Sequence, residues 1–340
     1  MNKFKFYFIL IITSITIFSC SKNDDSATVE PPRDYADQYK TDIEDIEEYL
    51  KTNYITVTNA PGQTSDQDVV ISKITDATTQ PSIMSYLDAP TYPMLKTRIV
   101  ELHNIKYTLY YLILREGIGQ SPCNVDEVYS SYRGTYLQRT TTTTPPTSTI
   151  NATEFTNVIY PNEYLSLFTT VRGWKEIFPK FKTGTYVSNP NGTISYNDFG
   201  AGVMFIPSGL GYYIGSGSIP AYAPLVFSFK LYELQRSDDE GTGYRGTSSY
   251  IATPDGVFSY QEDLDGDGYV WTTSELPTGA TNPDDTDKDG IPDFLDVDDD
   301  ADNYTTRLEI KNPVTGLPFP FADIPTCTSG KKNYLDASCH

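Results

Sequence analysis

The residues best placed to do chemistry are aromatic and aliphatic side chains between positions 171 and 227. Trp174 follows Gly173 directly, and Phe205, Tyr212 and Phe227 come further along the chain. Almost no nucleophile or histidine lies among them, so a pocket built from them suits a reaction without proton transfer or a covalent intermediate. Rotation about an X–Pro peptide bond is such a reaction, with a barrier of about 18–20 kcal/mol because rotation breaks amide resonance.

The order and spacing of these residues resemble the FKBP-type peptidyl-prolyl isomerases over roughly residues 106–235. The segments that carry the resemblance are Tyr107–Leu112, Arg115–Gly117, Ser131–Thr135, Arg172–Glu176, Phe205–Tyr212 and Ile219–Phe229. The resemblance implies an α+β fold in which an antiparallel sheet wraps around a short helix. It also implies catalysis of prolyl isomerisation without a cofactor.

The resemblance assigns a set of pocket residues. They are Tyr132, Phe155, Val171, Trp174, Tyr212, Ile219 and Phe227. The indole would form the floor under the proline ring, and the other aromatic rings would form walls. The backbone N–H of Val171 and the hydroxyl of Tyr212 would hold substrate carbonyls. Because a twisted amide is less polar than a planar one, a dry aromatic cavity favours the twisted form over water.

One position departs from the family pattern. The family usually has Phe-Asp-Ser where this chain has Phe155-Thr156-Asn157, so a hydroxyl stands in place of a carboxylate. This departure leaves open a second class of function, a non-catalytic surface protein that binds proline-containing peptides. A third interpretation is that the aromatic residues are the core of an unrelated β-rich domain.

Acidic residues near the C-terminus form a second group with clear chemistry. Residues 285–296 place acids at positions 1, 3, 5, 9 and 12 of a loop with Gly290 at position 6, and residues 298–309 repeat the spacing with Asn303 there. Calcium prefers six to eight oxygen ligands, and a residue that permits a tight turn at position 6 lets one loop supply them. The predicted ligands are Asp285, Asp287, Asp289, Asp293, Asp296, Asp298, Asp300, Asp302 and Glu309.

A third acidic loop opens at Asp263 but is weaker, because Ser274 stands at its twelfth position. Together the loops resemble the calcium repeats of thrombospondin type 3 modules, which implies a structural role for the metal. The alternative is a solvated acidic tail. Taken alone, these repeats would also fit an adhesin or a matrix component.

The N-terminus is typical of a targeting segment. Lys3 and Lys5 precede an apolar run over residues 6–18, which is followed by Ser19 and Cys20. The run is shorter than the roughly 20 residues of a spanning helix, so a secretory signal is favoured over a membrane anchor. The pattern resembles a bacterial lipoprotein signal with Cys20 as the acylated residue. The acidic tract that follows resembles Bacteroidetes export signals, which predicts an outer-membrane lipoprotein that faces the periplasm or the cell surface.

The charge balance restricts the classes of partner that the chain is expected to bind. The net charge of −20 and the pI near 4.4 argue against nucleic acid, since phosphate binding needs clustered Lys and Arg. The expected partners are proline-containing polypeptides, together with the membrane through the lipid on Cys20. The chain resembles the gliding-motility-associated isomerases of Bacteroidetes, which implies a folding helper for exported proteins.

Elements that would position these residues follow from local patterns. Apolar residues at helical spacing predict a helix over 35–54, and a shorter helix is expected over 173–181. Strands are expected at 107–114, 128–137, 203–206 and 225–234, with a Thr/Pro loop over 140–149. Among the cysteines outside the signal, Cys327 and Cys339 are close enough in sequence to form a disulfide, which would leave Cys123 free.

Composition divides the chain into five parts. They are a signal peptide (1–19), a lipidated tether (20–34), an N-terminal extension (35–105), the isomerase domain (106–236) and a calcium-repeat segment (237–340). Large apolar residues thin out in the last part, so no ordinary core is expected there.

Overall fold

The computed structural model describes residues 31–242 and 251–340. The predicted signal peptide, Cys20 and most of the tether therefore lie outside the described residues. Among the residues that are described, no helix is both long and apolar enough to cross a membrane.

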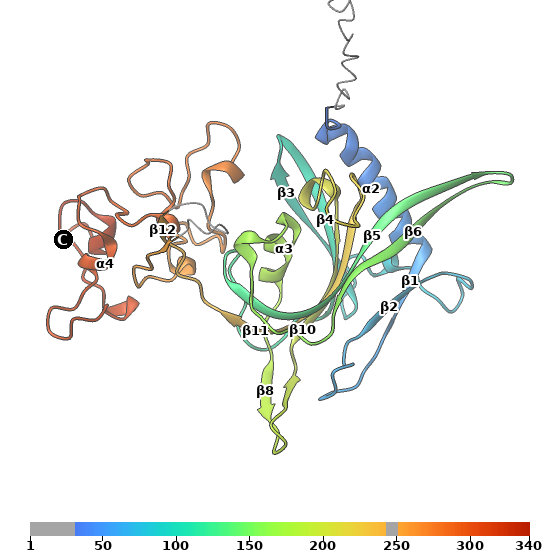
Figure 1. The fold of residues 1–340 in the computed structure, drawn as a ribbon, viewed down its shortest axis with the longest axis horizontal. Coiled ribbons are helices and arrows are strands. Elements are labelled where there is room, and N and C mark those ends of the chain that lie inside the picture. Colours follow the sequence, from blue (N-terminus) through green and yellow to red (C-terminus); the bar gives the residue numbers. More distant parts are fainter. Residues whose placement is uncertain (1–30, 243–250) are drawn as a thin grey trace, which may run out of the picture. The chain divides into compact units, whose positions relative to one another are not determined.

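A curved antiparallel sheet of seven strands forms the centre of the fold, which is of mixed α/β type (Figure 1). Its main path runs β3-β4-β10-β11-β5-β6, and β7 pairs with β5. The strands are β3 (Met94–Leu102), β4 (Ile105–Arg115), β5 (Glu127–Thr143), β6 (Pro146–Val158), β7 (Leu165–Ser166), β10 (Gly200–Ile206) and β11 (Leu225–Gln235). Strands β10 and β11 lie in the middle, and eleven of their eighteen residues have buried hydrophobic side chains. Such strands need cover on both faces of the sheet.

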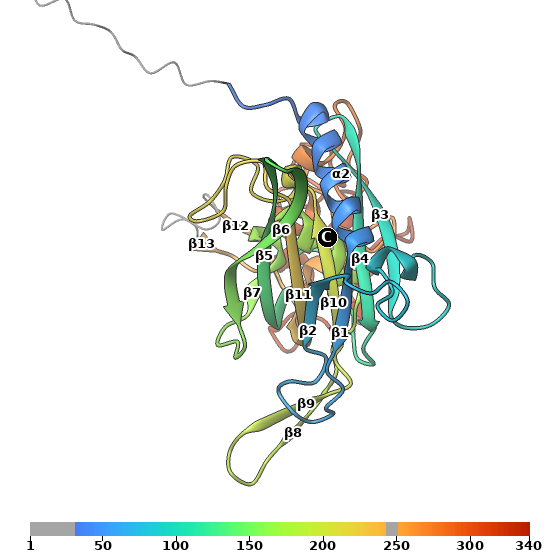
Figure 2. The same cartoon turned by 90° about the vertical axis from the view of Figure 1, so that its right-hand side faces the viewer.

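Helices cover both faces of this sheet. The helix α3 (Arg172–Ile177) lies inside the curve of the sheet, and its Trp174 and Ile177 join one apolar core. The helix α2 (Tyr35–Thr52) crosses the opposite face, where Ile46 and Leu50 join a second core (Figure 2). Because strand side chains alternate between faces, one set of strands serves both cores.

Helix α2 confirms the helix that the apolar spacing predicts. Asp34 caps its first turn by accepting hydrogen bonds from the N–H groups of Ala36 and Asp37. On its buried side, the Asp42 carboxylate accepts bonds from the backbone N–H (2.7 Å) and the hydroxyl (2.6 Å) of Ser208. The helix is thereby tied to the segment that follows β10 and leads to the Tyr212 loop.

The N-terminal extension is part of the architecture of the sheet. A hairpin of β1 (Asn53–Val57) and β2 (Val69–Lys73) continues from α2, and Val69 belongs to the core beneath that helix. Strand β3 pairs with β4 along its whole length, from Met94↔Ile113 to Leu102↔Ile105. The sheet therefore takes in residues N-terminal to position 106, where the composition places the start of the central domain.

The Thr/Pro run differs from its predicted loop. Residues 140–149 continue β5 and β6 into a long hairpin, with Thr143 paired to Pro146 at its end. Threonine is β-branched and suits extended backbone, and Thr142 and Thr147 are joined through their hydroxyls at 2.6 Å. The Thr/Pro composition predicts a loop of extended character, and pairing across the hairpin makes that extended backbone a pair of strands.

Two further hairpins and a short α-helix lie outside the main sheet. They are β8 (Thr185–Ser188) with β9 (Ile194–Asn197), β12 (Gly241–Thr242) with β13 (Ile251–Ala252), and α4 (Thr306–Glu309). The remainder of the C-terminal segment is loops with five short 3₁₀ turns, and no ordinary core is expected there from its composition. It nonetheless has two small apolar clusters, one around Val257, Ile310 and Tyr334 and one that joins Val270 and Phe294 to Cys123. The predicted disulfide Cys327–Cys339 is present, and Cys123 is free and buried.

Candidate functional site

Four aromatic side chains meet on the inner face of the sheet. The Trp174 indole is buried, with 4% of its surface exposed, and the rings of Tyr132 and Phe227 stand edge-on to it at centroid distances of 5.0 and 5.1 Å. Phe155 stands edge-on to Phe227 at 5.6 Å. This geometry is the favoured arrangement for aromatic pairs, so the rings hold one another in place.

Helix α3 brings the indole to this position because a glycine precedes it. A Cβ on Gly173 would lie only 2.6 Å from Cδ1 of Ile206 on β10, so the helix reaches the sheet only with glycine there. Phe178 continues the helix as a short 3₁₀ turn and packs on the indole at 5.0 Å. Gly173 is thus required for the close packing of α3 on β10, and this packing places the Trp174 indole.

The other three predicted pocket residues border the same cluster. Val171 is half-buried at the N-cap of α3, and within the described residues its backbone N–H donates no hydrogen bond. Ile219 is buried in the same core as the indole, while Tyr212 is 38% exposed. Burial, then Glu163 and Tyr212, raise the pKa of Tyr132, which places the Tyr212 hydroxyl near that ring.

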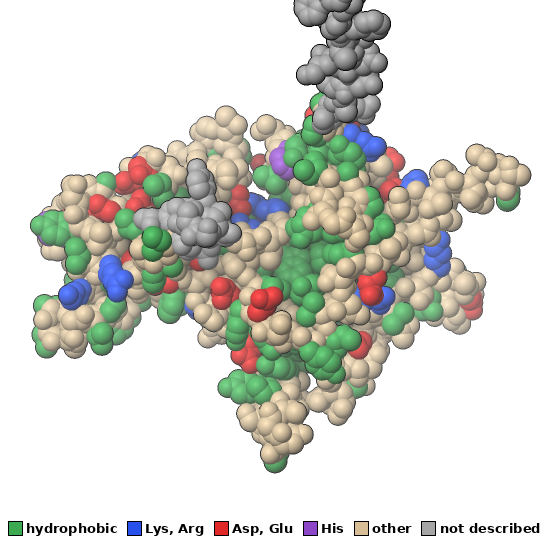
Figure 3. Space-filling view, in the orientation of Figure 1, with side chains coloured by type: hydrophobic (Ala, Val, Ile, Leu, Met, Phe, Trp, Pro, Cys, Tyr) green, Lys and Arg blue, Asp and Glu red, His purple; other side chains and the backbone are tan. Residues whose placement is uncertain are grey.

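The cluster faces an open hollow. Figure 3 shows hydrophobic side chains gathered in a hollowed area where α3 faces β5 and β6. Three pockets of about 370, 450 and 140 Å³ occur on the described residues, and each is open to the surface. Trp174 lines none of them, whereas Tyr132 lines the first.

A β-bulge sets the position of Phe155. The pairing of β5 with β6 shifts from Gly134↔Thr156 to Thr135↔Glu154, which leaves Phe155 as the extra residue. Such a bulge re-aims a side chain, here toward Phe227. Thr156, at the position of the family's acid, is half-buried beside Gly134 and has no carboxylate to offer.

Replacing Gly134 with alanine tests how closely these rings pack. The new Cβ would lie 2.6 Å from Cζ of Phe155 and 2.7 Å from Cε1 of Phe227, so both rings must move. We expect a loss of about 1–3 kcal/mol in unfolding free energy, the usual range for overpacking, measured by urea denaturation. Gly192→Ala is the control, because it strains a turn at φ +82° without meeting any atom within 4 Å. Equal binding of proline peptide by the two variants would contradict a pocket at Phe155.

The outer side of α3 is held by the acidic C-terminal segment. Glu275 forms ion pairs at 2.6 Å with both Lys175 and Arg172, and all three side chains are nearly buried. The Arg172 guanidinium also lies over the Tyr269 ring, 5.2 Å from its centroid. Although burial alone would raise it, these two cations together lower the pKa of Glu275. Segments far apart in the sequence thus position the helix that carries Trp174.

Glu275→Gln is expected to lower the unfolding free energy by about 3 kcal/mol at neutral pH, because it leaves Lys175 buried without its anion and leaves Arg172 with Glu176 alone. The folded-state pKa of Glu275 lies below its ordinary value, so this stabilisation is present above about pH 4.3 and disappears as pH falls through the folded value. Urea denaturation at pH 7 and pH 3 measures it. The difference in unfolding free energy between wild type and variant should be smaller at pH 3 than at pH 7. An unchanged difference, or an equal loss for Glu154→Gln in the exposed Arg133 pair, would contradict this account.

The predicted calcium loops bring most of their acids together. Carboxylate oxygens of Asp285, Asp287 and Asp289 lie within 4.8 Å of one another, and those of Asp298, Asp300 and Asp302 do the same. In each loop, an aspartate side chain accepts hydrogen bonds from backbone N–H groups of the same loop. In the first, Asp285 accepts bonds from the N–H groups of Lys288 and Gly290, and in the second Asp298 accepts one from Asn303.

Three predicted ligands lie outside these groups. Both carboxylate oxygens of Asp293 accept bonds from Thr286, and Asp296 accepts bonds from Val297 and Asp298. Glu309 differs, since it is 8% exposed and neither of its carboxylate oxygens has a hydrogen-bond partner within the described residues. Burial, then Asp300, Asp302 and Asp298, raise the pKa of Glu309 to about 8. Its carboxylate therefore feels the charges of the 298–302 group, although it is not one of the three carboxylates that lie within 4.8 Å of one another there.

The structure also assembles acids that the loop spacing does not identify. Asp284 joins Asp263 and Asp265 of the weak loop, and its carboxylate also accepts bonds from the N–H groups of Leu264 and Trp271. A second set, from outside the predicted ligand positions, gathers Asp238, Glu240, Asp255, Glu262 and Asp299. Only spatial convergence could reveal this set, because its members are up to sixty residues apart with no repeating interval.

Residues 253–334 match the family model described as BamM C-terminal. No curated protein matches the chain. Among solved structures, a peptidyl-prolyl cis-trans isomerase from Pseudomonas syringae pv. tomato is 17% identical with a TM-score of 0.28, over 43% of this chain and 84% of that one.

Two further structures are similar at the same level. FkpA from Escherichia coli is 24% identical with a TM-score of 0.27, over 38% of this chain and 48% of that one. The N-terminal domain of FKBP42 from Arabidopsis thaliana is 15% identical with a TM-score of 0.26, over 37% of this chain and 86% of that one.

Proposed function

We propose that the chain is an FKBP-type peptidyl-prolyl isomerase acting on exported polypeptides. The observation that carries the proposal is the buried Trp174 indole with Tyr132 and Phe227 edge-on to it at 5.0 and 5.1 Å. Figure 3 shows an apolar hollow on this part of the molecule. A proline ring placed on that floor would be surrounded by aromatic carbon. The proposal needs no cofactor, because the reaction makes and breaks no covalent bond.

The chemistry would come from the environment of the amide. The C–N bond loses its partial double-bond character as it twists, and its carbonyl loses charge separation. An apolar wall penalises the planar amide more than the twisted one, which lowers the barrier. The free N–H of Val171 would hold a flanking carbonyl, and the exposed hydroxyl of Tyr212 a second one, so that only the X–Pro bond turns.

Thr156 favours a second candidate, a protein that binds proline peptides with little turnover. A carboxylate at this position could polarise the substrate carbonyl region, whereas a threonine hydroxyl carries no charge. Binding through the aromatic floor would be retained in either case. The two candidates therefore predict different rates of prolyl isomerisation but a similar affinity for proline peptide.

A protease-coupled prolyl-peptide assay separates the candidates. The protein is the chain from residue 21 onward, and the probe is a short peptide with one X–Pro bond. For an isomerase, the observed rate should rise in proportion to protein concentration. Thr156→Asp should then raise kcat/KM several-fold, while peptide affinity changes little. No acceleration by either protein, with binding intact in a fluorescence titration, would leave the binder as the function.

We further propose that the acidic loops 285–296 and 298–309 bind calcium as structural ions. Support comes from the two groups of three aspartates and from the buried, unpartnered carboxylate of Glu309 beside the second group. A twelfth-position glutamate is the usual bidentate ligand of such loops. When bound, calcium would neutralise the crowded acids, and Asp298, Asp300, Asp302 and Glu309 would hold it.

The cellular setting is proposed from the N-terminus. Removal of residues 1–19 would leave Cys20 for acylation, and residues 20–34 would tether the fold to the outer membrane. Metabolic labelling with an alkyne fatty acid tests this, because label should appear on the wild type and be absent from Cys20→Ser. Labelling of both would contradict lipidation at Cys20.

A further inference from the structure

Three acids from separate turns of the C-terminal segment meet in its interior. Carboxylate oxygens of Asp255, Glu262 and Asp299 lie within 4.8 Å of one another. The three residues are 2%, 0% and 1% exposed, so water does not solvate them. None of the three occupies a ligand position in the repeats, and the aromatic hollow does not use them.

The free oxygens of this cluster have no partner. Within the described residues, neither carboxylate oxygen of Glu262 accepts a hydrogen bond, and the same holds for Asp299. Asp255 accepts one bond from the N–H of Val257 at 2.7 Å through Oδ1, and its Oδ2 is free. The nearby cation, Arg307, donates to the carbonyl of Pro254. Buried carboxylates without a counter-charge are strongly unfavourable, so the cluster calls for a positive ligand.

Protonation alone does not stabilise these buried carboxyl groups. Burial, then Asp299 and Asp255, raise the pKa of Glu262 well above its ordinary value, and burial raises the pKa of Asp255 to about 7. A neutral carboxyl group still needs a hydrogen-bond acceptor for its proton and donors for its oxygens. Those are not in place around Glu262, whereas a single cation would satisfy several of these oxygens at once.

We infer that Asp255, Glu262 and Asp299 bind one calcium ion in the interior of the C-terminal segment. A set made only of oxygen donors suits a hard cation rather than zinc or copper. Calcium–oxygen distances of about 2.3–2.6 Å place ligands up to about 5 Å apart across the ion, which agrees with the separation of these oxygens. Magnesium prefers to keep several waters, and this fully buried site offers little room for them.

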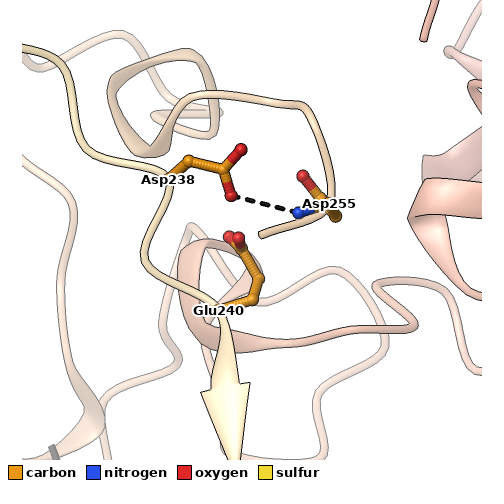
Figure 4. A group of neighbouring side chains, drawn as sticks. All are labelled: Asp238, Glu240 and Asp255. Carbon is orange, nitrogen blue, oxygen red and sulfur yellow. Dashed lines mark hydrogen bonds between the residues drawn. The ribbon is translucent and has the colours of Figure 1, made fainter. Parts of the chain in front are cut away.

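The position of this ion explains how the C-terminal segment is attached. Asp255 also belongs to a group with Asp238 and Glu240 (Figure 4), and the carboxylate of Asp238 accepts bonds at 3.1 Å from the N–H groups of Asp255 and Gly256. Asp238 comes shortly after β11 ends at Gln235. The ion would therefore fix the loop that leaves the central sheet, and this role is independent of isomerase activity.

Calcium stoichiometry on the chain from residue 21 onward tests the inference. Equilibrium dialysis against ⁴⁵Ca²⁺ should show Glu262→Gln binding one ion fewer than wild type. Asp323→Asn, an exposed acid of the same segment, should bind the wild-type number. The double variant Glu262→Gln/Asp299→Asn should lose the same single ion, while Glu262→Gln/Asp287→Asn should lose two. An unchanged number in Glu262→Gln would overturn the inference.

Thermal unfolding adds a signature that a purely structural role cannot produce. In calcium, Glu262→Gln should have a lower midpoint than wild type, because a ligand is missing. In chelator its midpoint should be higher, because the variant no longer buries a carboxyl group beside two other acids without a cation. A shift of the same sign in both conditions would count against the site. If the variants do not fold, anomalous scattering from lanthanide-soaked wild-type crystals decides, and absence of a peak at Glu262 refutes the inference.

Discussion

Trp174→Leu is expected to lower kcat/KM for prolyl isomerisation about 100-fold, which corresponds to about 2.7 kcal/mol of transition-state stabilisation. Leucine keeps an apolar side chain in the core but removes the flat surface that Tyr132 and Phe227 flank. The proline ring would then lack its floor, and the twisted amide would lose most of its apolar contacts. The protease-coupled assay on the chain from residue 21 onward measures the change.

Phe181→Leu provides the matched control for that result. Phe181 is fully buried in the same core and packs edge-on to Phe229 at 4.8 Å. It should lose similar packing energy and keep activity within about twofold of wild type. If both variants lose activity equally, the loss reports general destabilisation. If Trp174→Leu retains full activity, the indole is not the floor of the site.

Removing calcium is expected to have the second large effect, confined to the acidic segment. In chelator, backbone amides of residues 263–309 should lose protection from hydrogen exchange, while those of β4, β10 and β11 keep it. Each site filled at one hundred times its Kd contributes about 2.7 kcal/mol, so the two loops together contribute about 5 kcal/mol. Without metal, neighbouring carboxylates repel one another at short range.

Glu309→Gln and magnesium provide the controls for this experiment. The variant should weaken protection of residues 298–309 more than that of residues 285–296, because it removes only the twelfth ligand of its own loop. Magnesium at the same concentration should restore little protection. Identical exchange with and without calcium would mean that the small clusters around Tyr334 and Phe294 hold the segment unaided.

The link between the acidic segment and α3 gives the calcium sites a second consequence. Glu275 joins both Lys175 and Arg172, the two residues that flank Gly173 and Trp174 in the helix. Loss of order around residue 275 would leave Lys175 without its anion beside the aromatic floor, and Arg172 with Glu176 alone. Calcium removal should therefore also lower the affinity for proline peptide, whereas Asp323→Asn should not.

Periodic patterns determined much of this protein before any tertiary contact was considered. Apolar residues at helical spacing located α2, and β-favouring runs located β4, β5, β10 and β11, because these elements are stabilised mainly by one repeating face. Regular Asp-x-Asp spacing likewise determined that residues 285–289 and 298–302 would each converge, since one tight loop brings alternate side chains together.

Only the tertiary structure decided features that depend on distant partners. The threonines of 140–149 became strands because each found a partner across the hairpin, and Phe155 reached Phe227 because a bulge turned it inward. The meeting of Asp255, Glu262 and Asp299 has no local signature, because burial and proximity arise from chain folding and not from sequence interval.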